Sequence, residues 1–217
     1  MSTINTYFDN VYLINLDRRR DRLELATKEC NRQGIKFERF NAVDGLFFDD
    51  YVKYDDKTAD EKRWTNGAAA LVETTRLILL DAIEKKYDNI LILEDDLEFN
   101  PNINKVFEEN YQDIPSDWET FYFGLIHMKP YKMVSKKIAR VSQSFCCHCY
   151  AINGTFFEYM LELISKIEKP IDHYTFYDIQ PREKSYCFVP NLAYQKADYS
   201  DIGMESVHHP ALRNNYF

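Results

Sequence analysis

The hydrophobic positions along this chain alternate between two spacings, one typical of buried strands and the other of helices. Residues 10–16 (NVYLINL) and 89–93 (NILIL) are short apolar runs with Val and Ile, the pattern of a strand covered on both faces. Residues 18–33 and 67–86 carry apolar side chains at helical spacing, and Gly34 follows the first run as a helix stop. This alternation predicts an α/β fold, with a largely parallel sheet covered by helices.

The second half of the chain follows the same scheme less regularly. Asp17 and Asn66 are predicted to cap the two long helices. Residues 137–141 and 146–152 are predicted to form a pair of strands joined by a polar turn. The other predicted elements are strands at 36–41, 119–125 and 185–189 and helices at 101–111 and 155–169. No repeat, low-complexity tract or linker interrupts the sequence, so residues 1–217 are expected to form a single domain.

Three consecutive acids follow the apolar run at residues 90–93. Glu94, Asp95 and Asp96 cannot share a dry interior, so we expect them at the carboxyl edge of the sheet, outside the core. Ligands of open α/β sheets bind at that edge, and clustered carboxylates suit a divalent cation that bridges to a substrate's phosphates. The alternative is an acidic turn that only ends a strand.

A second polar cluster follows the first strand. Asn15, Asp17, Arg18 and Arg22 lie at the end of that strand and the start of the next helix, where guanidinium groups and a helix N-terminus favour phosphate. Arg18 and Arg22 are four residues apart and therefore share one helix face. The alternative is a solvated surface on which these arginines pair with neighbouring acids such as Asp21.

Composition narrows the classes of function. The chain has 217 residues and a formal net charge of −8, which argues against a nucleic-acid partner because such proteins present a basic face. No segment reaches the roughly 18–20 apolar residues of a membrane span, and the first ten residues lack the apolar region of a signal peptide. We therefore expect a cytoplasmic protein whose five cysteines are reduced thiols.

The segment Cys146-Cys147-His148-Cys149 raises the question of a zinc site. Neighbouring residues of a strand point to opposite faces, so these four side chains cannot converge on one tetrahedral ion. We instead predict a strand with His148 and Tyr150 on one face and Cys147, Cys149 and Ala151 on the other.

Two later segments offer further chemistry. Asp172 and His173 could supply a general base, or Asp172 could cap a short helix over residues 174–179. Near the end of the chain, His209 could ligate a metal, although a surface histidine is the commoner outcome.

Taken in order, several of these segments resemble glycosyltransferase family 25, the group of lipooligosaccharide and collagen galactosyltransferases. Each motif is weak alone, but their order along residues 10–202 is specific. The matching segments are 11–19 (VYLINLDRR), 37–45 (FERFNAVDG), 92–96 (ILEDD), 148–152 (HCYAI), 170–172 (PID), 194–195 (YQ) and 200–202 (SDI).

The resemblance implies a GT-A fold, a nucleotide-diphosphate sugar donor such as a UDP-hexose, and transfer to a glycan or protein hydroxyl with inversion. It also implies Mn²⁺ or Mg²⁺, held by Asp96 with Glu94 and His209. Asp172 is the expected base that deprotonates the acceptor. The residues expected to bind the nucleotide sugar are Asn15, Asp17, Arg18, Arg22, Asp44, Gly45, Glu94, Asp95, Gln195 and Asp201.

The sequence also departs from the family pattern. Family members commonly carry a Ser-His pair where this chain has Val72-Glu73. This departure leaves open a catalytically inactive GT-A domain that binds a glycan or a partner. A nucleotidyltransferase is a third possibility, but it would need a Gly-rich phosphate loop after the first strand, and residues 15–22 contain no glycine.

Overall fold

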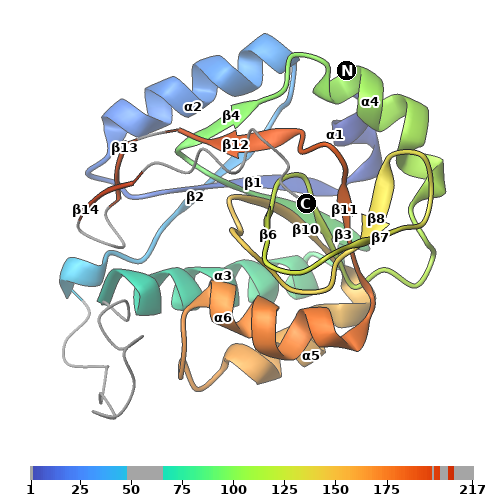
Figure 1. The fold of residues 1–217 in the computed structure, drawn as a ribbon. Helices are drawn as coiled ribbons and strands as arrows, with labels where there is room; N and C mark the ends of the chain where they lie inside the picture. Colours follow the sequence, from blue (N-terminus) through green and yellow to red (C-terminus); the bar gives the residue numbers. More distant parts are fainter. Residues whose placement is uncertain (1, 48–65, 197, 201–204, 208–217) are drawn as a thin grey trace.

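The computed structural model describes residues 2–47, 66–196, 198–200 and 205–207, and these form a sheet enclosed between two layers of helices (Figure 1). The central sheet has eight strands. In spatial order they are β2 (Glu38–Asn41), β1 (Asn10–Asn15), β3 (Asn89–Glu94), β10 (Cys149–Asn153), β5 (Thr120–Tyr122), β11 (Ser185–Phe188), β8 (Ile138–Arg140) and β7 (Lys132–Met133).

The sheet is mixed, and most of its strands share one direction. Only β10 and β8 run against their neighbours, so six of the eight strands point the same way. The parallel β1–β3 pairing sets Ile14 opposite Glu94. The predicted sheet, mainly parallel and flanked by helices, is confirmed.

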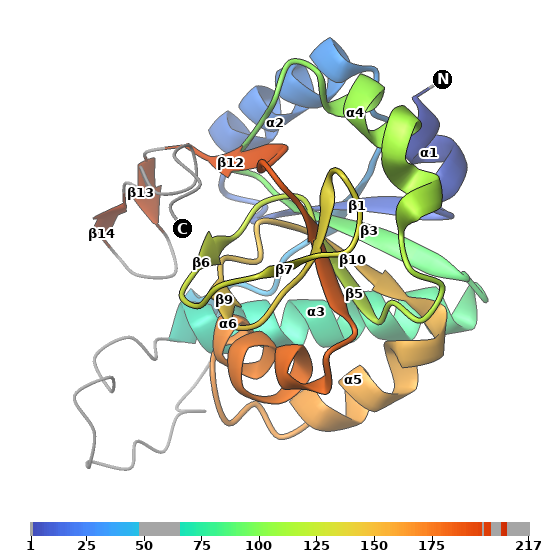
Figure 2. The same ribbon diagram turned by 45° about the vertical axis from the view of Figure 1, so that its right-hand side comes forward.

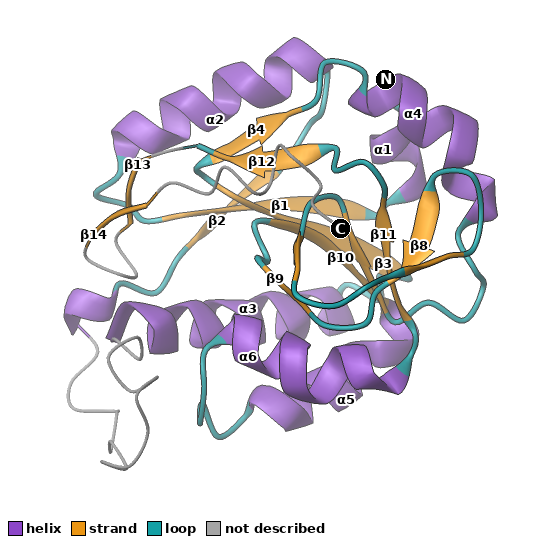
Figure 3. Ribbon diagram, in the orientation of Figure 1, coloured by secondary structure: helices purple, strands orange, loops and turns teal. Residues whose placement is uncertain are grey.

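Helices cover both faces of the sheet, as the colouring by secondary structure in Figure 3 makes clear. One face carries α1 (Thr3–Tyr7), α2 (Arg20–Gln33) and α4 (Ile103–Asn110), and the other carries α3 (Asn66–Glu84), α5 (Phe157–Ile164) and α6 (Ile171–Tyr174). Short helical turns lie at Gly45–Phe47, Tyr111–Asp113, Gly154–Phe156 and Gln180–Arg182, and a π-helical turn at Thr175–Ile179 continues α6.

Three two-stranded ribbons complete the described structure. They pair β4 (Leu97–Phe99) with β12 (Ala193–Gln195), β6 (Ile126–His127) with β9 (Ser144–Phe145), and β13 (Asp198–Ser200) with β14 (Glu205–Val207). Among the described residues, no helix is both long and apolar enough to cross a bilayer.

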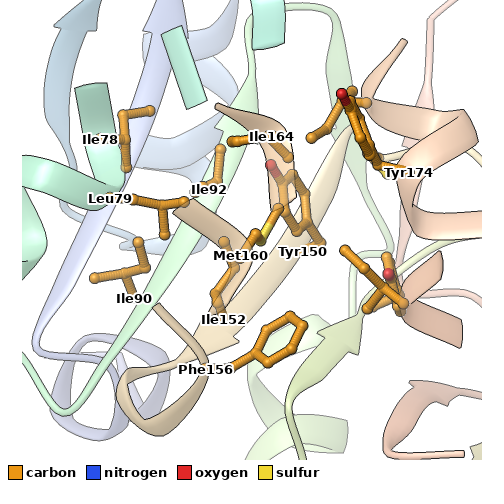
Figure 4. Close-up of a cluster of buried hydrophobic side chains, with 14 of the residues drawn as sticks. Ile78, Leu79, Ile90, Ile92, Tyr150, Ile152, Phe156, Met160, Ile164 and Tyr174 are labelled. Atoms are coloured by element: carbon orange, nitrogen blue, oxygen red, sulfur yellow. The ribbon is translucent and has the colours of Figure 1, made fainter. Parts of the chain in front are cut away.

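Alternating strand residues divide the interior into two cores. Tyr12 and Ile92 pack under α3 and α5, whereas Leu13 and Leu93 pack toward the layer of α2 and α4. Figure 4 shows the first core, in which Ile92 and Tyr150 from the sheet meet Leu79 from α3 and Met160 from α5.

The start of α2 differs from the prediction. The helix begins at Arg20, and Asp17 does not cap it; Arg19 occupies the cap position without a side-chain cap bond. The Asp17 carboxylate instead accepts a 3.2 Å hydrogen bond from Arg39. The end of α2 is as predicted, because Gly34 adopts φ 65° and its N–H bonds back to Asn31. Asn66 is likewise not a preceding cap but the first residue of α3.

The predicted pairing of residues 137–141 with 146–152 is wrong. Strand β8 pairs with β11, whereas β10 pairs with β3 and β5. The segment between them is held elsewhere, because the buried Gln180 side chain bonds both the N–H and the carbonyl of Ser144. Cys146 then takes φ 80°, which ends the extended conformation.

The break at Cys146 also changes the face of the sheet on which Cys147 lies. Cys149 and Ala151 lie in one core and Tyr150 in the other, as predicted. Cys147 shares the core of Tyr150, because it precedes the regular strand and does not follow its alternation. All five cysteines are free and buried.

Gly124 allows a close crossing that places β12. A Cβ atom at Gly124 would lie 2.1 Å from the carbonyl oxygen of Ala193, so no other residue fits without a backbone shift. The N–H groups of Leu192 and Ala193 both bond to the Phe123 carbonyl. This contact fixes the approach of β12 to β4 and thus the position of Gln195.

His127 provides a prediction about stability and pH. Burial lowers its pKa from the usual 6.5 to about 4, and its Nδ1 lies 2.9 Å from the Ser144 hydroxyl. Between pH 6.5 and pH 4, His127 is protonated in the unfolded chain but not in the folded protein. The free energy of unfolding therefore falls as the pH is lowered through this range. We expect His127→Gln to remove about 3 kcal/mol of this acid-dependent loss. Urea unfolding at pH 7 and pH 4 measures it; an identical pH dependence in the variant would contradict the assignment.

Candidate active site

The candidate site lies where β1 and β3 end side by side. Because these strands are parallel and adjacent, their carboxyl ends meet at one edge of the sheet. Asn15 is the last residue of β1 and Glu94 the last of β3, and a turn through Asp95 and Asp96 then leads to β4. The two polar clusters identified in the sequence therefore meet at this edge, through Asn15 and Arg22 on one side and Asp95 on the other.

Asp95 is held on both carboxylate oxygens. Asn15 Nδ2 donates to one of them at 2.7 Å, and Arg22 Nη1 donates to the other at 3.0 Å. The same Asn15 amide also bonds the Arg19 carbonyl, which ties the start of α2 to the end of β1. Asp95 is thus fixed in orientation.

The acids are more buried than the sequence predicted. Asp95 and Asp96 are each 9% exposed, whereas we expected them outside the core. The reason is Arg22, itself 7% exposed, whose Nη1 lies 3.0 Å from Asp95 and 3.7 Å from Asp96. A buried carboxylate is tolerated when a charged partner and hydrogen bonds compensate it.

Asp96 is positioned by contacts with residues 195 and 196. Gln195 Nε2 donates to Asp96 Oδ2 at 2.9 Å, and the Lys196 N–H donates to the Asp96 carbonyl at 2.8 Å. The β4–β12 ribbon, which aligns Leu97 with Gln195, makes this contact possible.

Glu94 is the most perturbed acid of the group. Its pKa is raised well above the usual value, first by burial and then by the negative charges of Asp96, Asp172 and Asp95. Burial also raises the pKa of Asp95, although Asn15 and Arg22 partly offset it. Such crowded carboxylates favour the binding of a proton or another cation.

Asp172 belongs to the same electrostatic region. It lies in the first turn of α6, which begins at Ile171, so it does not cap a helix over residues 174–179. Its side chain is half-buried. Asp172 raises the pKa of Glu94, and after burial it also raises that of the Cys147 thiol. The candidate base is thus close enough to Glu94, the last residue of β3, to act on it electrostatically.

A second group of predicted residues lies after β2 and includes Gly45, which lies against the start of α3. Arg18 Nε donates to Asp44 Oδ2 at 2.8 Å, and Asp44 Oδ1 accepts from the Leu46 N–H. Gly45 packs against the start of α3, since a Cβ there would lie 2.6 Å from the Gly67 nitrogen.

Arg39 is a site residue that the sequence reasoning missed. Its guanidinium donates to Asn15 Oδ1 at 3.1 Å and to Asp17 at 3.2 Å. The signal was its place in the second predicted strand, two residues before the strand's carboxyl end at Asn41. Arg39 therefore belongs to the same edge as Asn15.

The described residues fit a cation only together with a substrate. Within the ranges that the structure describes, no three His, Cys, Asp or Glu side chains are grouped to hold a metal ion. Asn15 and Arg22 engage both oxygens of Asp95, whereas Glu94 and Asp96, which accepts a hydrogen bond from Gln195, are carboxylates of suitable chemistry. A cation such as Mg²⁺ is usually held by one or two carboxylates plus substrate phosphates, and this donor set fits that mode. Asp201 and His209 lie outside the described residues.

Arg22 carries a testable prediction about stability. Arg22→Ala would leave Asp95 buried without its charged partner, a loss that typically costs about 3–5 kcal/mol. We expect the variant to lose stability on this scale, as measured by urea unfolding. Arg20→Ala, which removes an exposed arginine from the same helix, is the matched control and should change stability little. Equal effects from the two variants would show that Arg22 is not a structural counter-charge.

The mixed sheet, its helical layers and the acidic edge define a GT-A glycosyltransferase fold. The profile described as "Glycosyltransferase family 25 (LPS biosynthesis protein)" matches residues 8–175. The chain belongs to this family, and the resemblance inferred from the motifs is confirmed.

Individual relatives agree with this assignment. The chain is 24% identical to procollagen galactosyltransferase 2 of Mus musculus over 142 residues and 25% identical to that of Homo sapiens over 135. Each match covers 56% of this chain but only 21% of the relative, so the chain spans about a fifth of the length of these proteins.

A solved structure supports the fold alone. It is a glycosyltransferase involved in the glycosylation of the major capsid of PBCV-1, with a TM-score of 0.52 and 14% identity. The alignment covers 88% of this chain and 94% of that one.

Proposed function

We propose that this domain transfers a hexose from a nucleotide-diphosphate sugar to a hydroxyl group of a glycan or protein, with a divalent cation and with inversion at the anomeric carbon. The observation that carries the proposal is the hydrogen-bonded group of Asn15, Arg22, Asp95, Asp96 and Gln195 at the carboxyl edge of the sheet. Family membership gives the class of reaction. The names of the relatives support galactose as the sugar.

On the donor side, Asp96 and Glu94 would hold Mn²⁺ or Mg²⁺. The bound cation would neutralise the charge that develops on the departing diphosphate. Arg22 and Gln195 hold the Asp96 carboxylate from two sides. His209 would be a further metal ligand. The proposed nucleotide-sugar contacts are Asn15, Asp17, Arg18, Arg22, Asp44, Gly45, Glu94, Asp95, Gln195 and Asp201.

On the acceptor side, Asp172 would act as the general base. Its carboxylate takes the proton of the acceptor hydroxyl while that oxygen bonds to the anomeric carbon and the bond to the diphosphate breaks. A single displacement of this kind inverts the anomeric configuration. The electrostatic coupling of Asp172 to Glu94 supports a base close to the proposed metal site.

A thermal-shift panel tests the proposal. UDP-galactose, UDP-glucose and their N-acetyl relatives are each added with and without Mn²⁺. We expect at least one donor to raise the melting temperature, and more so with Mn²⁺, because a ligand that binds only the folded state stabilises it. Stabilisation by none of the donors would contradict the proposed function.

Arg18 carries a prediction about donor affinity. Arg18 is partly exposed and pairs with Asp44 at the site edge, so its guanidinium can turn to a diphosphate. Arg18→Ala is expected to weaken UDP binding by about 1–3 kcal/mol in calorimetry. Arg20→Ala is again the matched control. Wild-type affinity in Arg18→Ala would indicate that Arg18 forms only a solvated surface ion pair with Asp44.

A catalytically inactive binding domain is the second candidate. Val72 is fully buried in the core, and Glu73 pairs with Arg76 at 2.5 Å, so the positions of the family's Ser-His pair serve packing and an ion pair here. This alternative predicts donor or glycan binding without turnover, whereas the enzyme predicts both.

A further inference from the structure

A cluster of partly exposed aromatic side chains lies beside the proposed base. It consists of Phe145 from β9 together with His173, Phe176 and Tyr177 from α6 and the π-helical turn after it. Tyr177 is 52% exposed, and the other three rings are half-buried. Figure 2 shows β9 next to α6. The proposed donor and metal residues use none of these four rings.

The rings are held in a defined arrangement. Phe145 and Phe176 stack with their centroids 4.5 Å apart and an interplanar angle of 11°. His173 meets Tyr177 edge to face at 5.7 Å, and Phe176 meets Tyr177 at 4.8 Å. The buried Gln180–Ser144 contacts fix β9 against the helical segment, so the cluster is pre-formed. Pre-formed rings lose little conformational entropy on binding.

The cluster is continuous with the candidate site on both of its segments. His173 directly follows Asp172, the proposed base. Phe145 directly precedes Cys146, a buried residue whose thiol pKa is raised by burial and by the charges of Asp172, Glu94 and Asp96. A molecule resting on the exposed rings would therefore lie next to Asp172, at the place where an acceptor hydroxyl must be deprotonated.

We propose that Phe145, His173, Phe176 and Tyr177 form the acceptor subsite and that its ligand is a pyranose ring of a glycan acceptor. One face of a pyranose presents C–H groups that pack on an aromatic ring, while its hydroxyls stay at the rim, within reach of polar groups. The Tyr177 hydroxyl and the His173 ring supply such polar groups. This inference rests on the proposed function and specifies its acceptor: a sugar ring, not a side-chain hydroxyl of a bare protein.

Saturation-transfer difference NMR tests the subsite without any donor. The probes are the methyl β-glycosides of galactose, glucose and their N-acetyl relatives, titrated into the full chain. We expect binding of at least one glycoside through its C–H face, about 3–10-fold weaker in Tyr177→Ala. Tyr177→Phe keeps the ring and should keep the contact. Tyr159→Ala removes a tyrosine of similar exposure, 43%, from α5 and is the matched control.

The outcomes separate this inference from the proposed function. Unchanged glycoside binding in both Tyr177→Ala and the double variant Phe176→Leu/Tyr177→Ala would overturn the subsite, as would failure of every glycoside to bind. Neither result affects stabilisation by UDP-sugars, which tests the donor site alone. Far-UV circular dichroism shows whether each variant is folded. Tyr177 is largely exposed, so Tyr177→Ala should retain the fold.

Discussion

Asp172→Asn should lower the rate of sugar transfer by roughly 10²–10⁴-fold while leaving nucleotide binding close to that of the wild type. Asparagine keeps the size of the side chain but cannot accept a proton at neutral pH. Asp172 lies in the first turn of α6 and acts electrostatically on Glu94, so it is close to the donor acids without belonging to their hydrogen-bonded group. Transfer rates and UDP calorimetry on the same preparation separate the two effects.

The control for this variant is Asp178→Asn. Asp178 lies in the π-helical turn after α6 and pairs with Lys169 at 2.5 Å. The same substitution there removes another carboxylate of this segment, one that is paired with a lysine. Transfer near the wild-type rate in Asp172→Asn would place the base elsewhere. His173 and Asp201 would be the next residues to test.

Asp96→Ala should abolish transfer and remove the part of nucleotide stabilisation that depends on the metal. Asp96 accepts a 2.9 Å hydrogen bond from Gln195 and lies 3.7 Å from Arg22. Two groups that are far apart in the sequence therefore orient this acid. Its removal also relieves a charge that raises the pKa of Glu94, so the protein should remain folded. A thermal shift with UDP, with and without Mn²⁺, measures the loss.

Asp113→Ala is a suitable control for Asp96→Ala. Asp113 is an exposed acid in the turn after α4, and its replacement changes the net charge by the same amount. An active Asp96→Ala enzyme that still responds to Mn²⁺ would remove Asp96 from the proposed metal site.

Much of the fold could be predicted from local patterns. The runs at residues 10–16 and 89–93 are strands because both of their faces are apolar, and Gly34 ends α2 because it can adopt a positive φ. The pairing of residues 137–141 was not predictable from such signals. It depends on Gln180 and on the φ of Cys146, and neither leaves a periodic trace in the sequence.

The candidate site, like the fold, was predicted only in part. The sequence located the acids at the end of β3 and the polar group at the end of β1, because each set is contiguous in the chain. It did not show that Arg22 turns inward to Asp95, nor that Arg39 bonds Asn15. Both contacts cross between elements, and hydrophobic periodicity carries no information about a buried polar partner.

The most direct test of the proposed function is the fate of a nucleotide sugar followed by NMR. Wild-type protein is incubated with UDP-galactose, Mn²⁺ and the methyl glycosides, and the anomeric proton signals are recorded over time. The proposed function predicts release of UDP and a new galactoside of β configuration, opposite to that of the α-linked donor. An intact donor in the presence of every acceptor, or a product that keeps the α configuration, would contradict it.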